Sequence, residues 1–197
     1  GMSTTYTANN DVASVTNGSV TNYSYDANNN LTSVVVPVGT SSLSTSFSYT
    51  DSARPYYPTS QTDPQGNTLA YSYDTNGNLV STVDDLSTDN TYSYTYNSDG
   101  TLDTITDAMG GVTTYGYDSS GNLTSVTPPS PLGQTTIVPD TLSRVASRTD
   151  GKGQVTTYTY DDLDRITHIL YNNGSTEDYT FDADGNQTQL VDGDTTT

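Results

Sequence analysis

Few residues in this sequence have the type and surroundings that enzyme chemistry requires. His168 is the only histidine, and it lies in the run Arg165-Ile-Thr-His-Ile169. A single histidine can act as a general base, but no serine or threonine beside it has the flanking sequence of an activated nucleophile. We therefore interpret His168 as an exposed strand residue.

Carboxylates are the other candidates for acid–base chemistry. Adjacent pairs occur at Asp84-Asp85, at Asp161-Asp162 and at Asp182 with Asp184. A glycosidase needs two carboxyl groups about 5–10 Å apart across a cleft, one of them with a raised pKa. Glu177 is the only glutamate among 23 acidic residues, so the chain is rich enough in aspartate for chance pairs. We interpret these pairs as turn and edge residues, and we predict no catalytic residue and no enzymatic activity.

One segment superficially matches a calcium-binding loop. The run Asp182-Ala-Asp-Gly-Asn186 brings acidic and amide side chains together. With Gly185 at the sixth position of an EF-hand loop, the first and twelfth positions are Thr180 and Val191, where Asp and a bidentate Glu are required. The chain also has no cysteine, which excludes thiolate metal ligands. We predict no metal site and no cofactor, with weak Ca²⁺ binding by clustered turn aspartates as the alternative.

The balance of charge excludes two classes of function. Five basic against 23 acidic residues give a formal net charge of −18, which repels phosphate backbones and excludes nucleic acid as a partner. No apolar run approaches the ~20 residues that a membrane-spanning helix needs, and the longest, Val34-Val-Val-Pro-Val38, is typical of a strand. A cysteine-free chain rich in serine, threonine and asparagine suits a bacterial surface, so we expect a secreted or cell-surface protein.

Tyrosine is the most informative residue type. Only 30% of the chain is hydrophobic, which together with this charge would favour disorder, yet 17 residues are tyrosine. Their rings need apolar surroundings, so we expect an ordered, β-rich protein with a thin core of tyrosines. Tyr56 and Tyr57, between Pro55 and Pro58, lie outside the repeated pattern of the other tyrosines and form the candidate ligand patch.

An internal repeat organises the whole chain. The segment Tyr71-Ser-Tyr-Asp-Thr-Asn-Gly-Asn-Leu79 recurs as Tyr115-Gly-Tyr-Asp-Ser-Ser-Gly-Asn-Leu123. The second aromatic position recurs at intervals of 19 to 24 residues, at Tyr6, Tyr25, Tyr49, Tyr73, Tyr96, Tyr117, Pro139, Tyr160 and Phe181. We predict a single array over residues 1–197 with nine units, near 4–19, 20–44, 45–67, 68–89, 90–111, 112–133, 134–153, 154–175 and 176–197.

Each unit is predicted to be one β-hairpin. In Thr113-Thr-Tyr-Gly-Tyr117 the two tyrosines alternate along a strand, so both rings point to one face. Asp118 and Gly121 then form a turn, because aspartate suits its first position and glycine tolerates positive φ. Leu123 and Val126 begin the return strand. Their spacing of three requires either a β-bulge or partial covering of both faces.

The same pattern assigns residues in the other units. The predicted repeat core is Tyr23, Tyr25, Tyr71, Tyr73, Tyr115, Tyr117, Tyr158, Tyr160, Tyr179 and Phe181. The predicted repeat turns use Asp74, Gly77, Asp118, Gly121, Asp182 and Gly185. A second turn closes each unit, as in Asp63-Pro-Gln-Gly66, Asp107-Ala-Met-Gly110 and Asp150-Gly-Lys-Gly153. Segments 38–46, 51–60 and 128–133 do not fit and are interpreted as insertions between repeats.

The frame Tyr-x-Tyr-Asp-x-x-Gly-Asn-Leu, with Asp-x-x-Gly between copies, resembles the YD-repeat or RHS-repeat family. Ser143-Arg144 and Asp164-Arg165 come closest to the Gly-Arg that the family often has at the Gly-Asn position. The resemblance implies an extended or spiralling antiparallel sheet of hairpins that, when long enough, closes into a hollow shell. Family members include bacterial wall-associated proteins, RHS toxins whose shell encloses a C-terminal effector, a component of insecticidal toxin complexes, and the teneurins.

Two hypotheses for function follow. The first is a non-enzymatic structural scaffold from a secreted or cell-surface bacterial protein; nine hairpins are too few for a closed shell, so we expect a fragment whose partners are the rest of the parent chain or its effector. The alternative is a carbohydrate- or cell-wall-binding module with polysaccharide as partner. Either array would end in unpaired strand edges, which predicts self-association through those edges.

Overall fold

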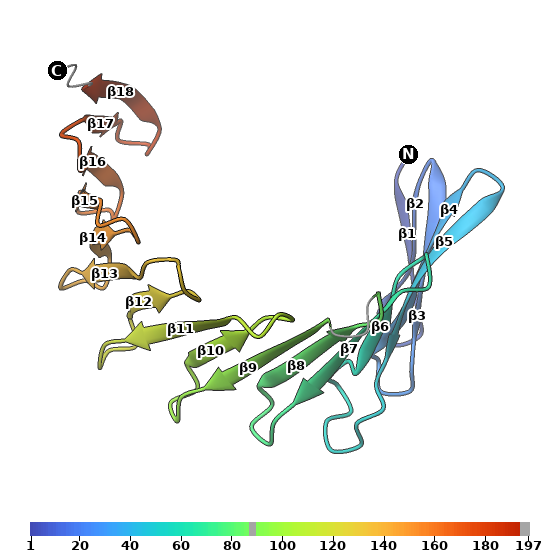
Figure 1. Cartoon of the computed structure of the whole chain (residues 1–197). Coiled ribbons are helices and arrows are strands. Elements are labelled where there is room, and N and C mark those ends of the chain that lie inside the picture. The colour runs from blue at the N-terminus through green and yellow to red at the C-terminus, as the bar shows by residue number, and fades with distance from the viewer. Residues whose placement is uncertain (87–89, 194–197) are drawn as a thin grey trace. The chain divides into compact units, whose positions relative to one another are not determined.

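The computed structural model describes residues 1–86 and 90–193, and within these ranges it contains eighteen β-strands and no helix (Figure 1). The prediction of an all-β chain of antiparallel hairpins is therefore confirmed. The chain separates into two compact units, one made of Gly1–Thr95 with Thr106–Gly110, the other of Tyr96–Ile105 with Gly111–Thr197. The prediction of nine repeats in a single array stays a prediction.

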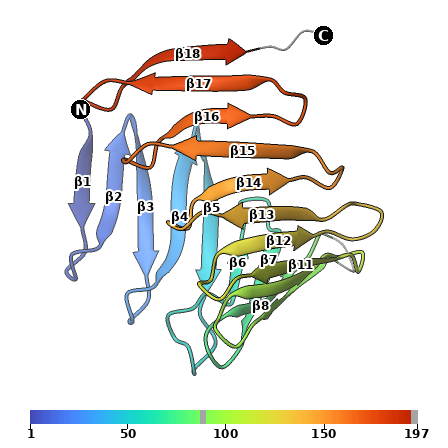
Figure 2. The ribbon, with the colours of Figure 1, turned by 90° about the vertical axis from the view of Figure 1, so that its left-hand side faces the viewer.

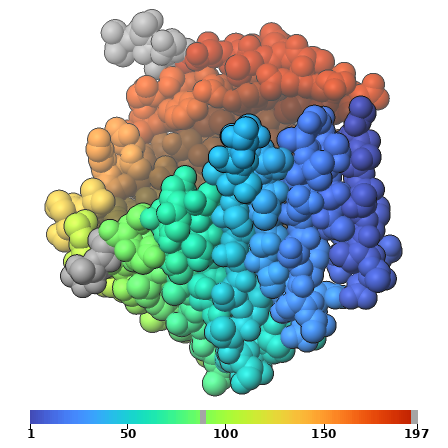
Figure 3. Space-filling view, turned by 90° about the vertical axis from the view of Figure 1, so that its right-hand side faces the viewer, coloured from blue at the N-terminus to red at the C-terminus, as the bar shows by residue number. Residues whose placement is uncertain are grey.

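The first unit is an antiparallel meander. Its strands are β1 (Ser3–Tyr6), β2 (Val12–Asn17), β3 (Ser19–Tyr25), β4 (Leu31–Val38), β5 (Ser41–Ser48), β6 (Ser60–Thr62), β7 (Thr68–Tyr73), β8 (Leu79–Asp84) and most of β9 (Thr91–Tyr96). Each strand pairs with the next along the chain, from β1 with β2 to β8 with β9. Figure 3 shows strands of this unit side by side, coloured from blue to green.

The second unit repeats the arrangement. Its strands are most of β10 (Leu102–Thr106), then β11 (Val112–Tyr117), β12 (Leu123–Thr127), β13 (Thr135–Pro139), β14 (Val145–Thr149), β15 (Val155–Tyr160), β16 (Ile166–Leu170), β17 (Thr176–Phe181) and β18 (Gln187–Gly193). From β11 to β18 each strand again pairs antiparallel with its successor (Figure 2).

A β-bulge solves the register problem posed by the return strand. In β11 and β12, Tyr115 lies opposite Val126 and Tyr117 lies opposite Leu123, with the register shift between Gly116 and Tyr117. Two residues that are three apart therefore share a face, and the bulge alternative is confirmed. The same shift precedes the last residue of β1, β3, β7, β13, β15 and β17.

The alternation of side chains gives the sheet two different faces. Pairs such as Tyr23 with Val34 and Tyr158 with Ile169 place aromatic and branched residues on one face, called here the aromatic face. The residues between the tyrosines, such as Ser72 and Thr159, lie on the opposite face, where serine and threonine dominate and most side chains are exposed. Both faces are needed to explain why the chain is rich in tyrosine and hydroxyl residues alike.

No apolar side chain is fully buried among the described residues. The ten aromatic residues of the predicted repeat core are all half-buried instead, because in a single layer only neighbouring side chains cover a ring. The accessible surface is 12560 Å², against about 9,000 Å² expected for a compact monomer of this mass. The expected thin core is therefore a row of partly covered rings, and its weight in stability stays a prediction.

One of the three predicted insertions is wrong. Residues 38–46 continue a hairpin, with Val36 opposite Leu43 and Val38 opposite Ser41. Alternating serine and bulkier residues from Ser41 to Ser48 extend the pairing, as period-two patterning favours. Segment 51–59 contains no strand before β6 begins at Ser60, and 128–133 is a loop between β12 and β13.

Candidate functional site

The Asp-x-x-Gly-Asn turn is the most extensively hydrogen-bonded feature that recurs along the chain. Asp118 accepts hydrogen bonds through Oδ1 from the backbone N–H groups of Ser120 at 2.8 Å and Asn122 at 2.9 Å, and through Oδ2 from the Asn122 side chain at 2.9 Å. Gly121 has φ of +83°, and its N–H donates to the Asp118 carbonyl at 3.0 Å. One carboxylate thus closes the whole turn.

Four other turns have the same three side-chain bonds, at Asp26 with Asn30, Asp63 with Asn67, Asp74 with Asn78 and Asp182 with Asn186. Gly77 and Gly185 have the positive φ that the prediction assigned to them. Hydrogen bonds to the charged form hold the pKa of these carboxyl groups below its usual range, with the Asn78 backbone N–H as the main cause for Asp74 and the Asn122 side chain for Asp118.

These bonds bear on the calcium alternative. In each of these turns both carboxylate oxygens already accept hydrogen bonds from the turn itself. Within the described ranges, no group of three or more Asp, Glu or His side chains is arranged to hold a metal ion. Weak Ca²⁺ binding stays a prediction.

In two turns arginine replaces asparagine and likewise donates a hydrogen bond to the aspartate of its turn. Arg144 Nε donates to Asp140 Oδ2 at 2.7 Å, and Arg165 Nε donates to Asp161 Oδ2 at 2.7 Å. The guanidinium is longer than the amide, so it extends beyond its own turn. In both the Asn and the Arg versions of the repeat, the side chain at this position donates a hydrogen bond to the aspartate that begins the turn.

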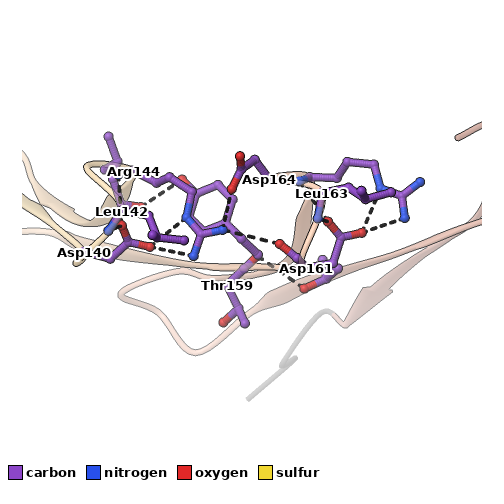
Figure 4. A network of polar contacts seen from close by, with 11 residues as sticks. Asp140, Leu142, Arg144, Thr159, Asp161, Leu163 and Asp164 are labelled. Carbon is purple, nitrogen blue, oxygen red and sulfur yellow. Dashed lines mark hydrogen bonds and ion pairs between the residues drawn. The ribbon is translucent and has the colours of Figure 1, made fainter.

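The longer side chain links one turn to the next (Figure 4). Arg144 Nη1 donates to Asp164 Oδ1 at 2.8 Å and to the Asp161 carbonyl at 3.3 Å, both in the following turn. Its guanidinium also lies 4.6 Å from the centre of the Tyr160 ring, a cation–π contact. Arg144 therefore joins two repeats through polar and aromatic contacts at once, a contact we call the turn ladder.

The next step of the turn ladder is incomplete. Arg165 lies over Phe181 at 4.3 Å, as Arg144 lies over Tyr160. Its Nη1 atom is buried and has no hydrogen-bond partner among the described residues. The position equivalent to Asp164 is occupied by Gly185, whose missing Cβ would stand 3.9 Å from that nitrogen.

In the first unit, segment 51–58 forms the corresponding link. Arg54 donates to Asp51 Oδ2 at 2.9 Å and to the carbonyl of Asp74 in a later turn. Asn30 donates to the Pro55 carbonyl at 2.7 Å and is, at 8% exposure, the only buried residue in the described chain. This segment is therefore a tie between repeats that the sequence pattern did not reveal.

The predicted ligand patch is divided by the structure. Tyr56 is 65% exposed, whereas Tyr57 lies edge-on to Tyr73 with ring centres 5.1 Å apart. The Tyr57 hydroxyl also stands 2.9 Å from where a Cβ on Gly77 would be. Tyr57 thus contributes to packing although it is still 40% exposed, and Tyr56 presents more of its side chain to solvent. Ligand binding by the pair stays a prediction.

The second aromatic of a repeat also anchors its hydroxyl on the preceding repeat. The acceptors are the carbonyls of Val12 for Tyr25, Leu31 for Tyr49, Pro58 for Tyr73 and Val145 for Tyr160, at 2.9–3.1 Å. Burial raises the pKa of these four hydroxyls. The ring and the hydroxyl thus serve the same contact between hairpins.

A second polar cluster on the aromatic face was missed from the sequence. Tyr171 donates to Glu177 Oε1 at 2.9 Å, and Tyr179 donates to the other carboxylate oxygen. Glu177 raises the pKa of Tyr179 to about 12, while the two hydroxyls lower the pKa of Glu177. The pairing of strands β16, β17 and their turn creates this cluster, and spacing alone gave no signal for it. His168 lies on the opposite face, with Nδ1 2.7 Å from Asp178 Oδ1.

Comparison with known proteins identifies the family. The sequence model of the RHS Repeat family matches residues 6–41, 58–89, 96–135 and 140–176, more than half of the chain. The chain therefore belongs to the RHS repeat family, as its frame predicts. A search of the curated proteins finds no match.

Solved structures share the fold. The chain is similar to the crystal structure of TcdB2-TccC3, with a TM-score of 0.76, 17% identity and 100% of this chain covered. It is also similar to the crystal structure of TcdB2-TccC3-Cdc42, at 0.74, 16% and 97%, and to a Tc holotoxin pore from Photorhabdus luminescens, at 0.77, 16% and 100%. This chain spans only 11% or 12% of the length of those chains. Within the described part of the chain, no helix is long and apolar enough to cross a membrane.

Proposed function

We propose that this chain is a non-enzymatic structural segment of a secreted RHS-repeat protein. In that protein a longer array of the same repeats closes into a shell around a C-terminal effector, and this chain forms part of the shell wall. The observation that carries the proposal is the turn ladder, in which Arg144 joins its own carboxylate partner Asp140 to Asp164 of the following repeat. Together with the hydroxyl bonds of Tyr25, Tyr49, Tyr73 and Tyr160 to the preceding repeats, this contact joins successive repeats and so stabilises an extended array rather than shaping one site. The fold shared with the Tc structures supports the same role.

The electrostatics of the turns also favour a scaffold over an enzyme. A general acid needs a carboxyl group whose pKa is raised. The carboxyl groups of the five Asp–Asn turns described above have lowered pKa values instead, because their own turns donate hydrogen bonds to them, as at Asp118 and Asp182. Each carboxylate is thus committed to holding backbone geometry.

The test uses the full-length protein encoded by the gene that contains this chain. Electron microscopy should show a hollow particle, and a protease should leave the enclosed C-terminal segment intact. Arg144→Ala, which opens one step of the turn ladder, should make that segment susceptible, while Tyr56→Ala on an exposed ring should not. A solid or open particle, or equal cleavage of all three proteins, would overturn the proposal.

For the 197-residue chain taken by itself, we also propose self-association through the outer strands. Strand β18 is exposed along nearly its whole length, with Leu190 at 51% and Val191 at 46%. An unprotected edge of this kind pairs readily with another strand. Light scattering over a concentration series should show growing mass, and a constant monomer mass would contradict it.

A further inference from the structure

Hollows lie between neighbouring turns of the sheet. The hollow at Gln61, Asp63 and Asp84, the one at Asp11 and Asp26, and the one at Asp150 and Lys152 all contain charged side chains. A fourth hollow is lined by Gln154, Thr156, Tyr171, Asn172, Asn173 and Ser175, with no charged residue. On a chain of net charge −18, a neutral polar hollow is a distinctive feature.

Its neutrality has a local cause. The turns that close other repeats begin with aspartate, as at Asp63 and Asp150, but the corresponding turn here is Tyr171-Asn-Asn-Gly174. The backbone closure is the same, since Gly174 N–H donates to the Tyr171 carbonyl at 2.9 Å. A ring and two amides therefore occupy the place that a carboxylate and its partners take elsewhere.

Some polar groups of the hollow already make hydrogen bonds within the protein, and others are available to a ligand. Asn172 Oδ1 accepts from Val155 N–H at 3.2 Å, and the Tyr171 hydroxyl donates to Glu177, which fixes the ring. The side chains of Gln154 and Thr156 make no hydrogen bond to any described residue. An amide and a hydroxyl can each donate and accept, so these two can satisfy ligand hydroxyl groups of either role.

From this arrangement we infer that the hollow binds a neutral sugar unit of a polysaccharide. Its volume of about 360 Å³ lies at the small end of the range for small-molecule sites, which combine an aromatic surface with a few placed polar groups. The ring of Tyr171 offers a surface for the apolar face of a pyranose. Gln154 and Thr156 supply hydrogen bonds to its hydroxyls. This site is separate from the Tyr56–Tyr57 patch and does not depend on the shell proposal.

The test titrates the intact chain with maltohexaose, cellohexaose and xylohexaose, observed by amide NMR, with hexagalacturonate as the anionic counterpart. At least one neutral glycan should bind with a dissociation constant below about 1 mM and shift the resonances of Gln154, Asn172 and Ser175. The anionic glycan should bind about tenfold more weakly. Absence of saturable binding by all three neutral glycans would overturn the inference.

Single substitutions test whether the glycan binds in this hollow. Gln154→Ala and Thr156→Val each remove one polar group that is available to the ligand, and each should weaken binding about tenfold. The circular dichroism spectrum should stay unchanged, which shows that the fold is retained. Gln61→Ala, in the comparable hollow that contains Asp63, is the matched control and should bind normally. Binding that both variants retain, or that only Tyr56→Ala abolishes, would contradict a site in this hollow.

Discussion

Arg144 Nη1 lies 2.8 Å from Oδ1 of Asp164, one repeat further along the chain. The pair joins two turns that each already have an internal carboxylate bond. Arg165 repeats the geometry over Phe181 but meets Gly185 where the second carboxylate would be. The sequence thus contains one complete and one incomplete copy of the same contact.

A carboxylate at position 185 should complete the second copy and stabilise the chain relative to a neutral side chain at the same position. In Gly185→Asp the new carboxylate can accept from Arg165 Nη1, as Asp164 does from Arg144. Gly185→Asn is the matched control, because both side chains carry the same backbone strain at the positive φ of +87° found here. The Asp variant should have a higher melting temperature than the Asn variant, by about 1–3 °C, and the difference should shrink in 1 M salt. Equal melting temperatures at low salt would contradict the assignment.

The half-buried rings should contribute less than an enclosed core. Tyr117→Ala is expected to lower the free energy of unfolding by about 1–2 kcal/mol, below the 3–5 kcal/mol typical of a fully buried aromatic residue. Urea denaturation measures the change, and Ser119→Ala in the adjacent exposed turn is the control. A loss under about 0.5 kcal/mol would mean that these rings do not hold the sheet together.

The turn carboxylates should make stability fall in acid. Asp118 has a folded pKa below its ordinary value of 3.8, so its contribution is complete above about pH 4 and is lost as the pH falls through the lower folded value. Asp118→Asn should lower the melting temperature at pH 7 by about 2–4 °C.

The difference between wild type and Asp118→Asn should then shrink as the pH falls below 4. This comparison separates the turn from general charge repulsion, which acidification relieves in both proteins. A difference that is constant from pH 7 to about pH 2.5 would show that the carboxylate charge does not stabilise the turn.

The cluster at Glu177 predicts that the Tyr179 hydroxyl titrates at a higher pH than an ordinary tyrosine. The pKa of Tyr179 is raised to about 12 because Glu177 accepts its hydroxyl hydrogen. The folded value exceeds the ordinary 10.0, so this contribution is complete below pH 10 and is lost as the pH rises through 12. Glu177→Gln should bring the titration of Tyr179 down toward pH 10, measured by NMR of labelled tyrosine Cζ, with Tyr179→Phe for assignment. An unchanged midpoint would contradict the role of Glu177.

The two tyrosines of segment 51–58 should separate in their effects on stability. Tyr57→Ala removes an edge-on contact with Tyr73 and should lower the free energy of unfolding by about 1 kcal/mol. Tyr56→Ala removes a ring that is 65% exposed and should change it by less than about 0.5 kcal/mol. Urea denaturation of the two variants side by side provides the comparison, and equal losses would place both rings in the packing.

The repeat frame predicts most of the local structure because the residues within each unit specify the turn and the strands of that unit. Asp118 and Gly121 specify a turn within four residues, and the alternation of Tyr115 with Tyr117 specifies a strand. The spacing of Leu123 and Val126 even pointed to the bulge that the register shows. Local residue types determine these features, so one sequence suffices to predict them.

Contacts between repeats were beyond such reasoning. The bond of Asn30 to the Pro55 carbonyl joins residues 25 apart, and the length of segment 51–58 gave no sign of its contacts. The cluster of Tyr171, Glu177 and Tyr179 depends on which residues face each other across β16 and β17. Side-chain reach and strand register decide these contacts, and neither follows from composition or period.

The single-layer construction of each unit affects how stability responds to temperature. Unfolding exposes less apolar surface per residue than in a protein with an enclosed core, because the rings are already partly hydrated. The heat-capacity increment per residue should therefore lie below the usual ~12–15 cal/mol/K. A small increment flattens the stability curve, so folding of this chain depends less on the entropy of water and changes little between a cold and a warm environment.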